Sequence, residues 1–250
     1  MEPPTAVRID HLEKHYGDLH AVKDLSLSIA EGEIFGLLGP NGAGKSTLIG
    51  ILTGAVRKTS GTVLVFGKDV ERDYLETRRS IGVVPQETIS DGFFTVWDIM
   101  RFQSGFYGVK PDDSRLRGIL ERLTLWEKRD ERVERLSGGM KRRLLVAKAL
   151  VHDPRFFILD EPTAGVDVFL RVHLWDYVRQ INRKGTTTLL TTHYIEEAER
   201  LCHRVAIMNH GALLCVDTIP AILDMTGAKT LEDAFVSLTK EERHDRLDPA

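Results

Sequence analysis

A glycine-rich turn with a lysine, GPNGAGKST at residues 39–47, joins the apolar run EIFGLL to the helical segment KSTLIGILTG. The turn fits the pattern G-x-x-x-x-G-K-[ST], which requires a preceding strand and a following helix. Gly42 and Gly44 let the backbone curl so that its N–H groups face inward, the helix N-terminus supplies about half a positive charge, and Lys45 supplies a whole one. An accidental glycine turn would match the four fixed positions in roughly one chain in a hundred of this size. The stretch therefore predicts a phosphate-binding turn.

The hydroxyl side chains after the lysine have an expected role of their own. Ser46 is expected to place its hydroxyl on Mg²⁺, with Thr47 beside it. The residues expected to bind the phosphates are Gly39, Pro40, Asn41, Gly42, Ala43, Gly44, Lys45, Ser46 and Thr47.

Composition argues against several classes of protein. The 250 residues carry a net charge of -3, so the chain lacks the strongly basic character of a nucleic-acid binder, and we expect no nucleic-acid partner. Two cysteines, Cys202 and Cys215, are too few and too far apart for a disulfide scaffold or a zinc site, which fits a reducing, cytosolic setting. No stretch approaches 18 uninterrupted apolar residues, and the N-terminus lacks the pattern of a signal peptide. Any work at a membrane is therefore expected to need a partner.

Strand-like and helix-like segments alternate over most of the chain. This alternation predicts an α/β fold with a mostly parallel sheet and helices on both sides. From about Thr95 to Val151 the pattern changes to helical periodicity with scattered charge, which predicts an inserted helical lobe. The polar final segment, EERHDRLDPA, is expected to be a solvated tail.

Polar side chains end three of the predicted strands. RFFILDEP at residues 155–162 ends in Asp160 and Glu161, which point in different directions because side chains alternate along a strand. That division suits Asp160 in the Mg²⁺ shell and Glu161 polarising the water that attacks the γ-phosphate. His193 closes LLTTH, and Gln86 closes IGVVPQ, in the same manner. Each could instead be a solvated or structural residue; the phosphate-binding turn in the same chain favours function.

A second glycine pair lies in VERLSGGMKRR at residues 133–143. Ser137 before Gly138 and Gly139 is a sound N-cap for the helix MKRRLLVAKAL, and the plain reading is a capped helix with an ordinary solvated basic face. Two glycines, however, cost helix stability, and a close approach of the backbone to an anion would explain them. The contacts of Lys141, Arg142 and Arg143 stay open between phosphate, a neighbouring molecule and water.

Together these segments resemble the nucleotide-binding subunit of an ATP-binding cassette (ABC) transporter over roughly residues 6 to 238. GPNGAGKST is similar to Walker A, Gln86 to the Q-loop, LSGGM to the signature, FILDEP to Walker B, AGVD to the D-loop and His193 to the H-loop. The resemblance implies catalytic roles for Glu161, His193 and Gln86. It also implies that Tyr16 stacks on adenine; without the resemblance, Tyr16 would be interpreted as an ordinary core or surface residue. It implies further nucleotide contacts from Ser137, Gly138, Gly139 and Asp167, and Mg²⁺ ligation by Ser46, Gln86 and Asp160.

The resemblance also implies how such a subunit works. Two cassettes, identical or not, face head to tail and bury two ATP molecules with Mg²⁺, so that each signature completes the other cassette's site. Hydrolysis loosens the pair and moves a separate membrane permease, which places the subunit at the cytoplasmic face of the membrane. IGVVPQE, LSGGMKRR and TTHYIEEAERLC look like the exporter branch that pairs with ABC-2 type permeases for drug, polysaccharide or lipid-like cargo. Val166, Val168 and His203 depart from that branch's usual residues and weaken only the subgroup assignment.

The implied architecture is one P-loop NTPase domain with an N-terminal antiparallel β subdomain. A soluble ABC ATPase that transports nothing, for example of the cluster-assembly type, is the alternative function. A P-loop kinase or GTPase would have no use for the signature or for His193. The ABC ATPase domain is expected to span residues 1–238, followed by a polar tail at 239–250. Within the domain, the core and β subdomain are expected at about 1–86 and 156–216. The helical subdomain is expected at about 87–155 and the C-terminal helices at about 217–238.

Overall fold

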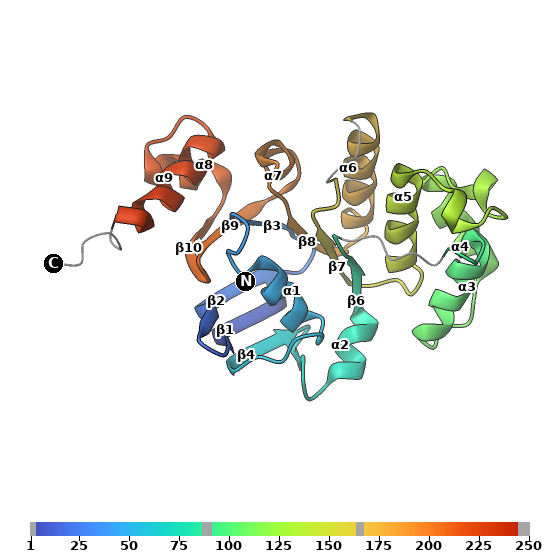
Figure 1. Cartoon of the computed structure of the whole chain (residues 1–250), viewed down its shortest axis with the longest axis horizontal. Coiled ribbons are helices and arrows are strands. Elements are labelled where there is room, and N and C mark those ends of the chain that lie inside the picture. The colour runs from blue at the N-terminus through green and yellow to red at the C-terminus, as the bar shows by residue number, and fades with distance from the viewer. Residues whose placement is uncertain (1–3, 87–91, 164–167, 245–250) are drawn as a thin grey trace. The chain divides into compact units, whose positions relative to one another are not determined.

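The structure is a computed structural model that describes residues 4–86, 92–163 and 168–244 (Figure 1). The chain divides into two compact units. The first unit comprises Met1–Thr77 and Leu189–Ala250, and the second comprises Arg78–Thr188. Each unit is described by itself.

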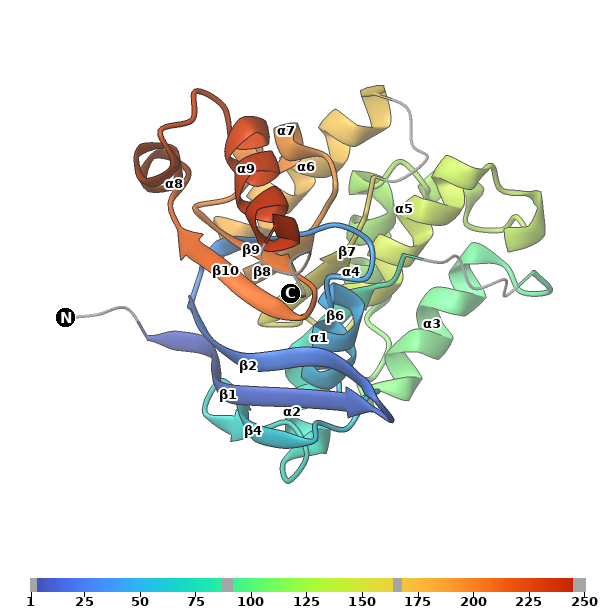
Figure 2. The same ribbon diagram turned by 60° about the vertical axis from the view of Figure 1, so that its left-hand side comes forward.

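An antiparallel sheet with strand order β2-β1-β4-β5 begins the first unit, and Figure 2 shows β1 between β2 and β4. Alternate residues of β2 are buried, among them Leu25, Leu27 and Ile29, which is the pattern of a sheet with one face on a core. The expected N-terminal antiparallel β subdomain is therefore confirmed. The strands are β1 (Thr5–Tyr16), β2 (Leu19–Ala30), β4 (Ser60–Val65) and β5 (Lys68–Asp69).

The first unit also contains four strands in the order β10-β9-β3-β8. β3 runs parallel to β9, and the edge strand β10 runs antiparallel to β9. All five residues of β3 are buried, as expected for a strand covered on both faces. The elements are β3 (Ile34–Leu38), α1 (Lys45–Leu52), β8 (Thr187–Thr191), whose first two residues belong to the second unit, α7 (Ile195–Leu201), β9 (Arg204–Asn209), β10 (Ala212–Asp217), α8 (Ile219–Thr226) and α9 (Leu231–His244).

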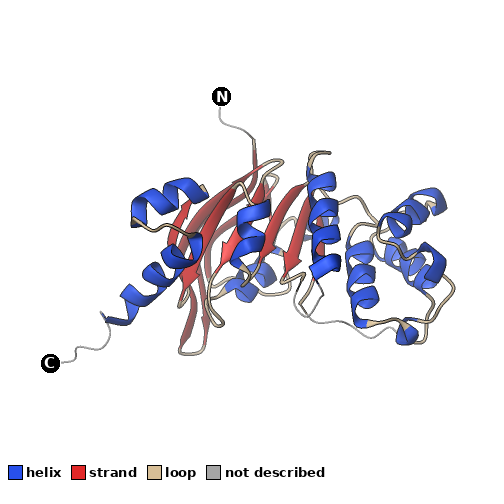
Figure 3. Cartoon of the chain, turned by 90° about the horizontal axis from the view of Figure 1, so that it is seen from above, coloured by secondary structure: helices blue, strands red, loops and turns tan. Residues whose placement is uncertain are grey.

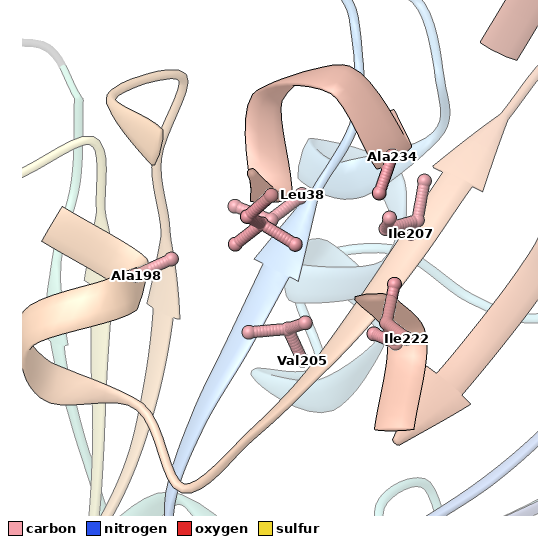
Figure 4. Close-up of a cluster of buried hydrophobic side chains, with 7 residues drawn as sticks. Leu38, Ala198, Val205, Ile207, Ile222 and Ala234 are labelled. Atoms are coloured by element: carbon pink, nitrogen blue, oxygen red, sulfur yellow. The ribbon is translucent and has the colours of Figure 1, made fainter. Parts of the chain in front are cut away.

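A cluster of buried apolar side chains packs the C-terminal helices onto this part of the sheet (Figure 4). Leu38 of β3, with Val205 and Ile207 of β9, forms the sheet side of the cluster. Burial of this apolar surface is what holds α7, α8 and α9 against the strands. The helix side consists of Ala198 of α7, Ile222 of α8, and Leu231 and Ala234 of α9.

The second unit contains a parallel pair of strands, β6 and β7. Between β6 and β7 the described residues form helices and connecting segments, as the blue ribbons of Figure 3 show. This confirms the inserted helical region and, with β3 and β9, the mostly parallel sheet. The elements are β6 (Ile81–Val84), α3 (Val96–Phe106), α4 (Asp113–Arg122), the short turns η1 (Trp126–Lys128) and η2 (Val133–Arg135), α5 (Gly138–Ala149), β7 (Phe156–Asp160) and α6 (Val168–Asn182).

Several details differ from the expected boundaries. The second compact unit, Arg78–Thr188, extends on both sides beyond the helical subdomain expected at about 87–155. A short helix, α2 (Tyr74–Ser80), was not expected at all. The polar tail expected from residue 239 begins inside α9, which continues to His244 because the apolar side of its first turns already anchors it. None of the helices in the described residues combines the length and the apolar character needed to cross a bilayer.

Candidate functional site

The glycine-rich turn of the first unit links the end of β3 to the start of α1. Gly42 and Gly44 have φ angles of 82° and 103°, a left-handed backbone that favours glycine. A Cβ on Gly44 would also lie 2.6 Å from the carbonyl oxygen of Ala21, and one on Gly39 would lie 2.5 Å from that of Met208. The glycines therefore set both the curvature of the turn and its close packing.

Lys45 lies at the first position of α1 and is only 6 % exposed. Its Nζ atom donates to the carbonyl oxygens of Gly39 at 2.6 Å and Pro40 at 3.1 Å, so the ammonium group is held inside the curve of the turn. The neighbouring Ser46 is exposed. The positive end of α1 and the ammonium thus share one small region, which suits an anion such as a phosphate.

Two further predicted residues belong to the first unit. Tyr16 ends β1 with 46 % of its surface exposed, and Lys14 Nζ lies 4.4 Å from the centre of its ring. The ammonium covers one face of the ring as a cation–π contact. His193 follows β8 and is exposed, with its ring 4.2 Å from that of Tyr194. Both side chains are therefore accessible, as a ligand-binding role requires.

Gln86 and Glu161 meet in the second unit, although 75 positions separate them in the sequence. Gln86 Nε2 donates to Glu161 Oε2 at 2.8 Å, and Glu161 is 8 % exposed. Glu161 also has a φ of 47°, a left-handed conformation that costs of order 1–3 kcal/mol in a residue other than glycine. Such backbone strain is characteristic of functional sites. Asp160, the last residue of β7, is half-buried beside it.

The serine of the second glycine pair caps its helix, as predicted. Ser137 Oγ accepts a hydrogen bond from the Met140 amide at 3.2 Å, and α5 begins at Gly138. Ser137 and Gly138 are both exposed, and apart from its chain neighbours and its own helix backbone, a Cβ on Gly138 would meet no atom of the described residues within 4 Å. Packing among the described residues thus gives no reason for glycine at position 138.

Arg142 is the residue of this region that the sequence did not identify. It is only 6 % exposed, so the interpretation of its helix face as ordinary and solvated is wrong at this position. The missed signal is helical spacing: Val146 and Ala149, four and seven residues further along α5, are buried on the same face. Its guanidinium donates to the backbone carbonyls of Pro85 at 2.6 Å, Gln86 at 3.0 Å, Asp160 at 2.9 Å, Glu161 at 2.7 Å and Pro162 at 2.8 Å.

The neighbouring basic residues differ from Arg142. Arg143 Nη1 donates to the carbonyl oxygen of Leu123 at 3.0 Å and contacts the Thr124 hydroxyl, so Arg143 also binds its own chain. Lys141 is half-exposed, and the described residues give its side chain no hydrogen bond or ion pair. Of the basic run, only Lys141 fits the solvated interpretation.

Burial favours the neutral form of three titratable groups away from these residues, His152, Cys202 and Cys215. His152 stacks on Tyr107 with ring centroids 3.5 Å apart, and its Nε2 lies 3.0 Å from the carbonyl oxygen of Ile81. A carbonyl can only accept, so Nε2 carries the proton. Burial lowers the pKa of His152 to about 4. Cys202 and Cys215 are both unpaired, and burial raises the pKa of each thiol, so neither is an activated nucleophile.

The D-loop residue Asp167 lies outside the described residues, and so do its three predecessors in the AGVD segment.

Comparisons with known proteins agree with these observations. A family model described as ABC transporter matches residues 22–164. The Nod factor export ATP-binding protein I of Paraburkholderia xenovorans is 43 % identical over 211 residues, which are 84 % of this chain and 69 % of that protein. The linearmycin resistance ATP-binding protein LnrL of Bacillus subtilis is 37 % identical over 233 residues, 92 % of this chain and 75 % of that protein. A solved structure of an ATP binding subunit of an ABC transporter superposes on this chain with a TM-score of 0.87 at 25 % sequence identity. The superposition covers 94 % of this chain and 99 % of the solved chain. The chain therefore belongs to the ABC transporter family and is one of its ATP-binding cassettes, a P-loop ATPase.

Proposed function

We propose that this cassette hydrolyses ATP to power the export of a substrate through a separate membrane permease. The observation that carries the catalytic part is the hydrogen bond between Gln86 and the nearly buried, strained Glu161. It joins a polar residue after β6 to a carboxylate after β7, at the carboxyl ends of parallel strands, where such folds bind ligands. The export part rests on the printed names of the relatives, which are an export and a resistance ATP-binding protein.

The residues of each unit have separate proposed roles. In the first unit, Lys45 and backbone N–H groups of the glycine-rich turn bind the phosphates of ATP, Tyr16 stacks on adenine, and His193 contacts the γ-phosphate. In the second unit, Glu161 polarises the attacking water as a general base. The side-chain amide of Gln86 would orient the Glu161 carboxylate, because its hydrogen bond fixes one of the two carboxylate oxygens.

The proposed Mg²⁺ ligands are chemically suited to that ion. They are the Ser46 hydroxyl, the Asp160 carboxylate and the amide oxygen of Gln86, all hard oxygen donors of the kind that Mg²⁺ prefers. Gln86 uses its Nε2 on Glu161, which leaves its Oε1 for a cation. Bound Mg²⁺ would neutralise charge on the β- and γ-phosphates.

We further propose that the signature residues act on a second cassette. Ser137 and Gly138 are exposed at the positive end of α5, and the packing of the described residues does not require glycine at 138. An anion approaching from outside the chain would require it. Ser137, Gly138 and Gly139 would therefore bind the γ-phosphate of ATP held by the glycine-rich turn of another cassette, identical or paralogous, and the resemblance adds a nucleotide contact by Asp167.

The proposed permease is of the ABC-2 type, and docking on it would place the cassette at the cytoplasmic face of the membrane. The test is to express the chain with and without a candidate ABC-2 type permease, and to fractionate the membranes. We expect the chain in the membrane fraction only when the permease is present, and ATP-driven transport in vesicles with the wild type but not with Glu161→Gln. A chain that stays out of the membrane fraction in both cases would favour the non-transport alternative.

A further inference from the structure

Three side chains with metal-ligating atoms cluster on the β1–β2 hairpin of the first unit, next to Tyr16 but including none of the residues proposed to bind the phosphates of ATP. They are Glu13, His15 and His20, and one ligand atom from each lies within 4.8 Å of the other two. Two imidazoles and one carboxylate are the ligand set of many protein sites for first-row transition metals.

The strand register explains why these side chains meet. Glu13 and His15 are two positions apart on β1, so they point to the same face of the sheet. His15 pairs with His20 directly across the hairpin, and their rings stack with centroids 3.9 Å apart. Glu13 Oε2 accepts a hydrogen bond from His20 Nε2 and lies 3.9 Å from His15 Nε2. The carboxylate thus faces both imidazoles.

The backbone that carries the cluster is held on both sides. β1 pairs with β2 on one side and with β4 on the other. The Thr59 amide donates to the carbonyl of Glu13 at 2.9 Å, and the His15 amide donates to Thr59 Oγ1 at 3.0 Å. The Asp24 amide donates to Glu13 Oε1 at 3.1 Å, which fixes that oxygen and leaves Oε2 toward the histidines. Hydrogen bonds of this kind orient a ligand in advance of metal binding.

We propose that Glu13, His15 and His20 form a binding site for a divalent transition cation of the zinc type. A tetrahedral zinc site with bonds of about 2.1 Å places its ligand atoms about 3.4 Å apart, so the ligand atoms need shifts of only about an ångström. Because a metal lies in the plane of each ligating ring, the stacked rings must turn, and the His15 side chain is 44 % exposed and has room to do so. The His20 Nε2 atom must be free of its proton to bind the metal, and the fourth position is left to water.

The chemistry separates this site from that of Mg²⁺-ATP. Mg²⁺ prefers six oxygen ligands and binds imidazole poorly, whereas Zn²⁺, Cu²⁺ and Ni²⁺ bind it well. The proposed site should therefore fill with Zn²⁺ in the presence of excess Mg²⁺.

The test is a calorimetric titration of the full chain with ZnCl₂ in a buffer that contains excess MgCl₂. We expect His20→Asn to weaken one Zn²⁺ site at least about tenfold, the scale on which even hydrogen-bond partners of metal ligands act. The matched control is His210→Asn, which alters an exposed histidine of the same unit outside the cluster and should leave the titration unchanged. Co²⁺, titrated as a second probe, should give visible absorption bands that His20→Asn abolishes and His210→Asn keeps.

Three results would overturn the proposal: unchanged Zn²⁺ affinity in His20→Asn, an equal loss in His210→Asn, or binding by the wild type only at millimolar Zn²⁺. If circular dichroism shows that His20→Asn is unfolded, Glu13→Gln decides instead. It preserves the size of the side chain and an acceptor for the Asp24 amide, and it must also weaken Zn²⁺ at least about tenfold.

Discussion

Replacing Arg142 by methionine tests a buried charge that joins three segments of the second unit. Methionine keeps an unbranched apolar stem of similar length, so the change removes the guanidinium with little loss of packing. The guanidinium makes at least five hydrogen bonds to carbonyls, of which those to Pro162 and Glu161 are fully buried. The three others are half-buried, and water can replace the donor there.

The two buried bonds set the size of the effect. A hydrogen bond to a charged group contributes about 1.5–3 kcal/mol to stability. A buried carbonyl left without a donor cannot recover this energy from water, so the whole contribution is lost. The loss of two such bonds is partly offset, because the variant no longer has to remove the guanidinium charge from water on folding. We therefore expect the free energy of unfolding to decrease by about 3–5 kcal/mol. In a chain of 250 residues this corresponds to a drop in Tm of about 6–20 °C.

Differential scanning calorimetry of the purified chain measures this drop. Lys141→Met is the matched control, because it makes the same substitution at the neighbouring half-exposed position and should stay within about 0.5 kcal/mol of the wild type. Arg142→Lys should fall between the two, since a lysine has three donors and lacks the planar fork. If Tm falls by less than about 2 °C in Arg142→Met, water has replaced the guanidinium at the buried carbonyls and the reasoning fails.

Glu161→Gln should lower ATP turnover by about 10²–10⁴-fold while ATP still binds and a stable ATP-bound dimer accumulates; near wild-type hydrolysis would remove Glu161 from the role of base. Lys45→Ala should weaken or abolish ATP binding in equilibrium dialysis, and unchanged affinity with unchanged turnover would refute the phosphate-binding turn. Ser137→Arg should spare ATP binding to the monomer but block ATP-dependent dimerisation in size-exclusion chromatography; an intact dimer would refute binding in trans. The pKa of His152 is about 4 in the folded chain and about 6.5 in the unfolded chain. As the pH falls, the imidazole therefore binds a proton in the unfolded state before it does so in the folded state. Stability should therefore decrease by about 2–3 kcal/mol between pH 6.5 and 4, and His152→Phe should make urea unfolding less pH-dependent in that range.

The strands and the phosphate-binding turn could be predicted because their signals are local. β3 and β7 are continuous apolar runs, and a strand covered on both faces needs such a run. The turn depends on glycine at Gly42 and Gly44, whose left-handed backbone few other residues adopt. The capping role of Ser137 is local in the same way, since its side chain and the amide of Met140 lie within one helical turn.

Other features could not be predicted because they depend on contacts distant in sequence. The helix α2 has the segment YLETRRS, of which only Thr77 is buried, so it shows no apolar stripe to recognise. The strain at Glu161 and its hydrogen bond to Gln86 arise only when β6 and β7 pair. The buried state of Arg142 likewise needs carbonyls from two loops distant in sequence, and residue type alone favours an exposed arginine.

Arg142 also ties the signature helix to the proposed catalytic residues within the second unit. Ser137 caps α5, and Arg142 lies on the next turn of the same helix, which is a rigid element. From there the guanidinium binds the carbonyls of Gln86 and Glu161, whose side chains bind each other. Moving α5 away from these segments would break the five hydrogen bonds of Arg142, two of them fully buried, at a cost of several kcal/mol. We therefore expect the signature, Gln86 and Glu161 to move as one body, so that a phosphate bound at Ser137 would affect the placement of the carboxylate that is proposed to activate water.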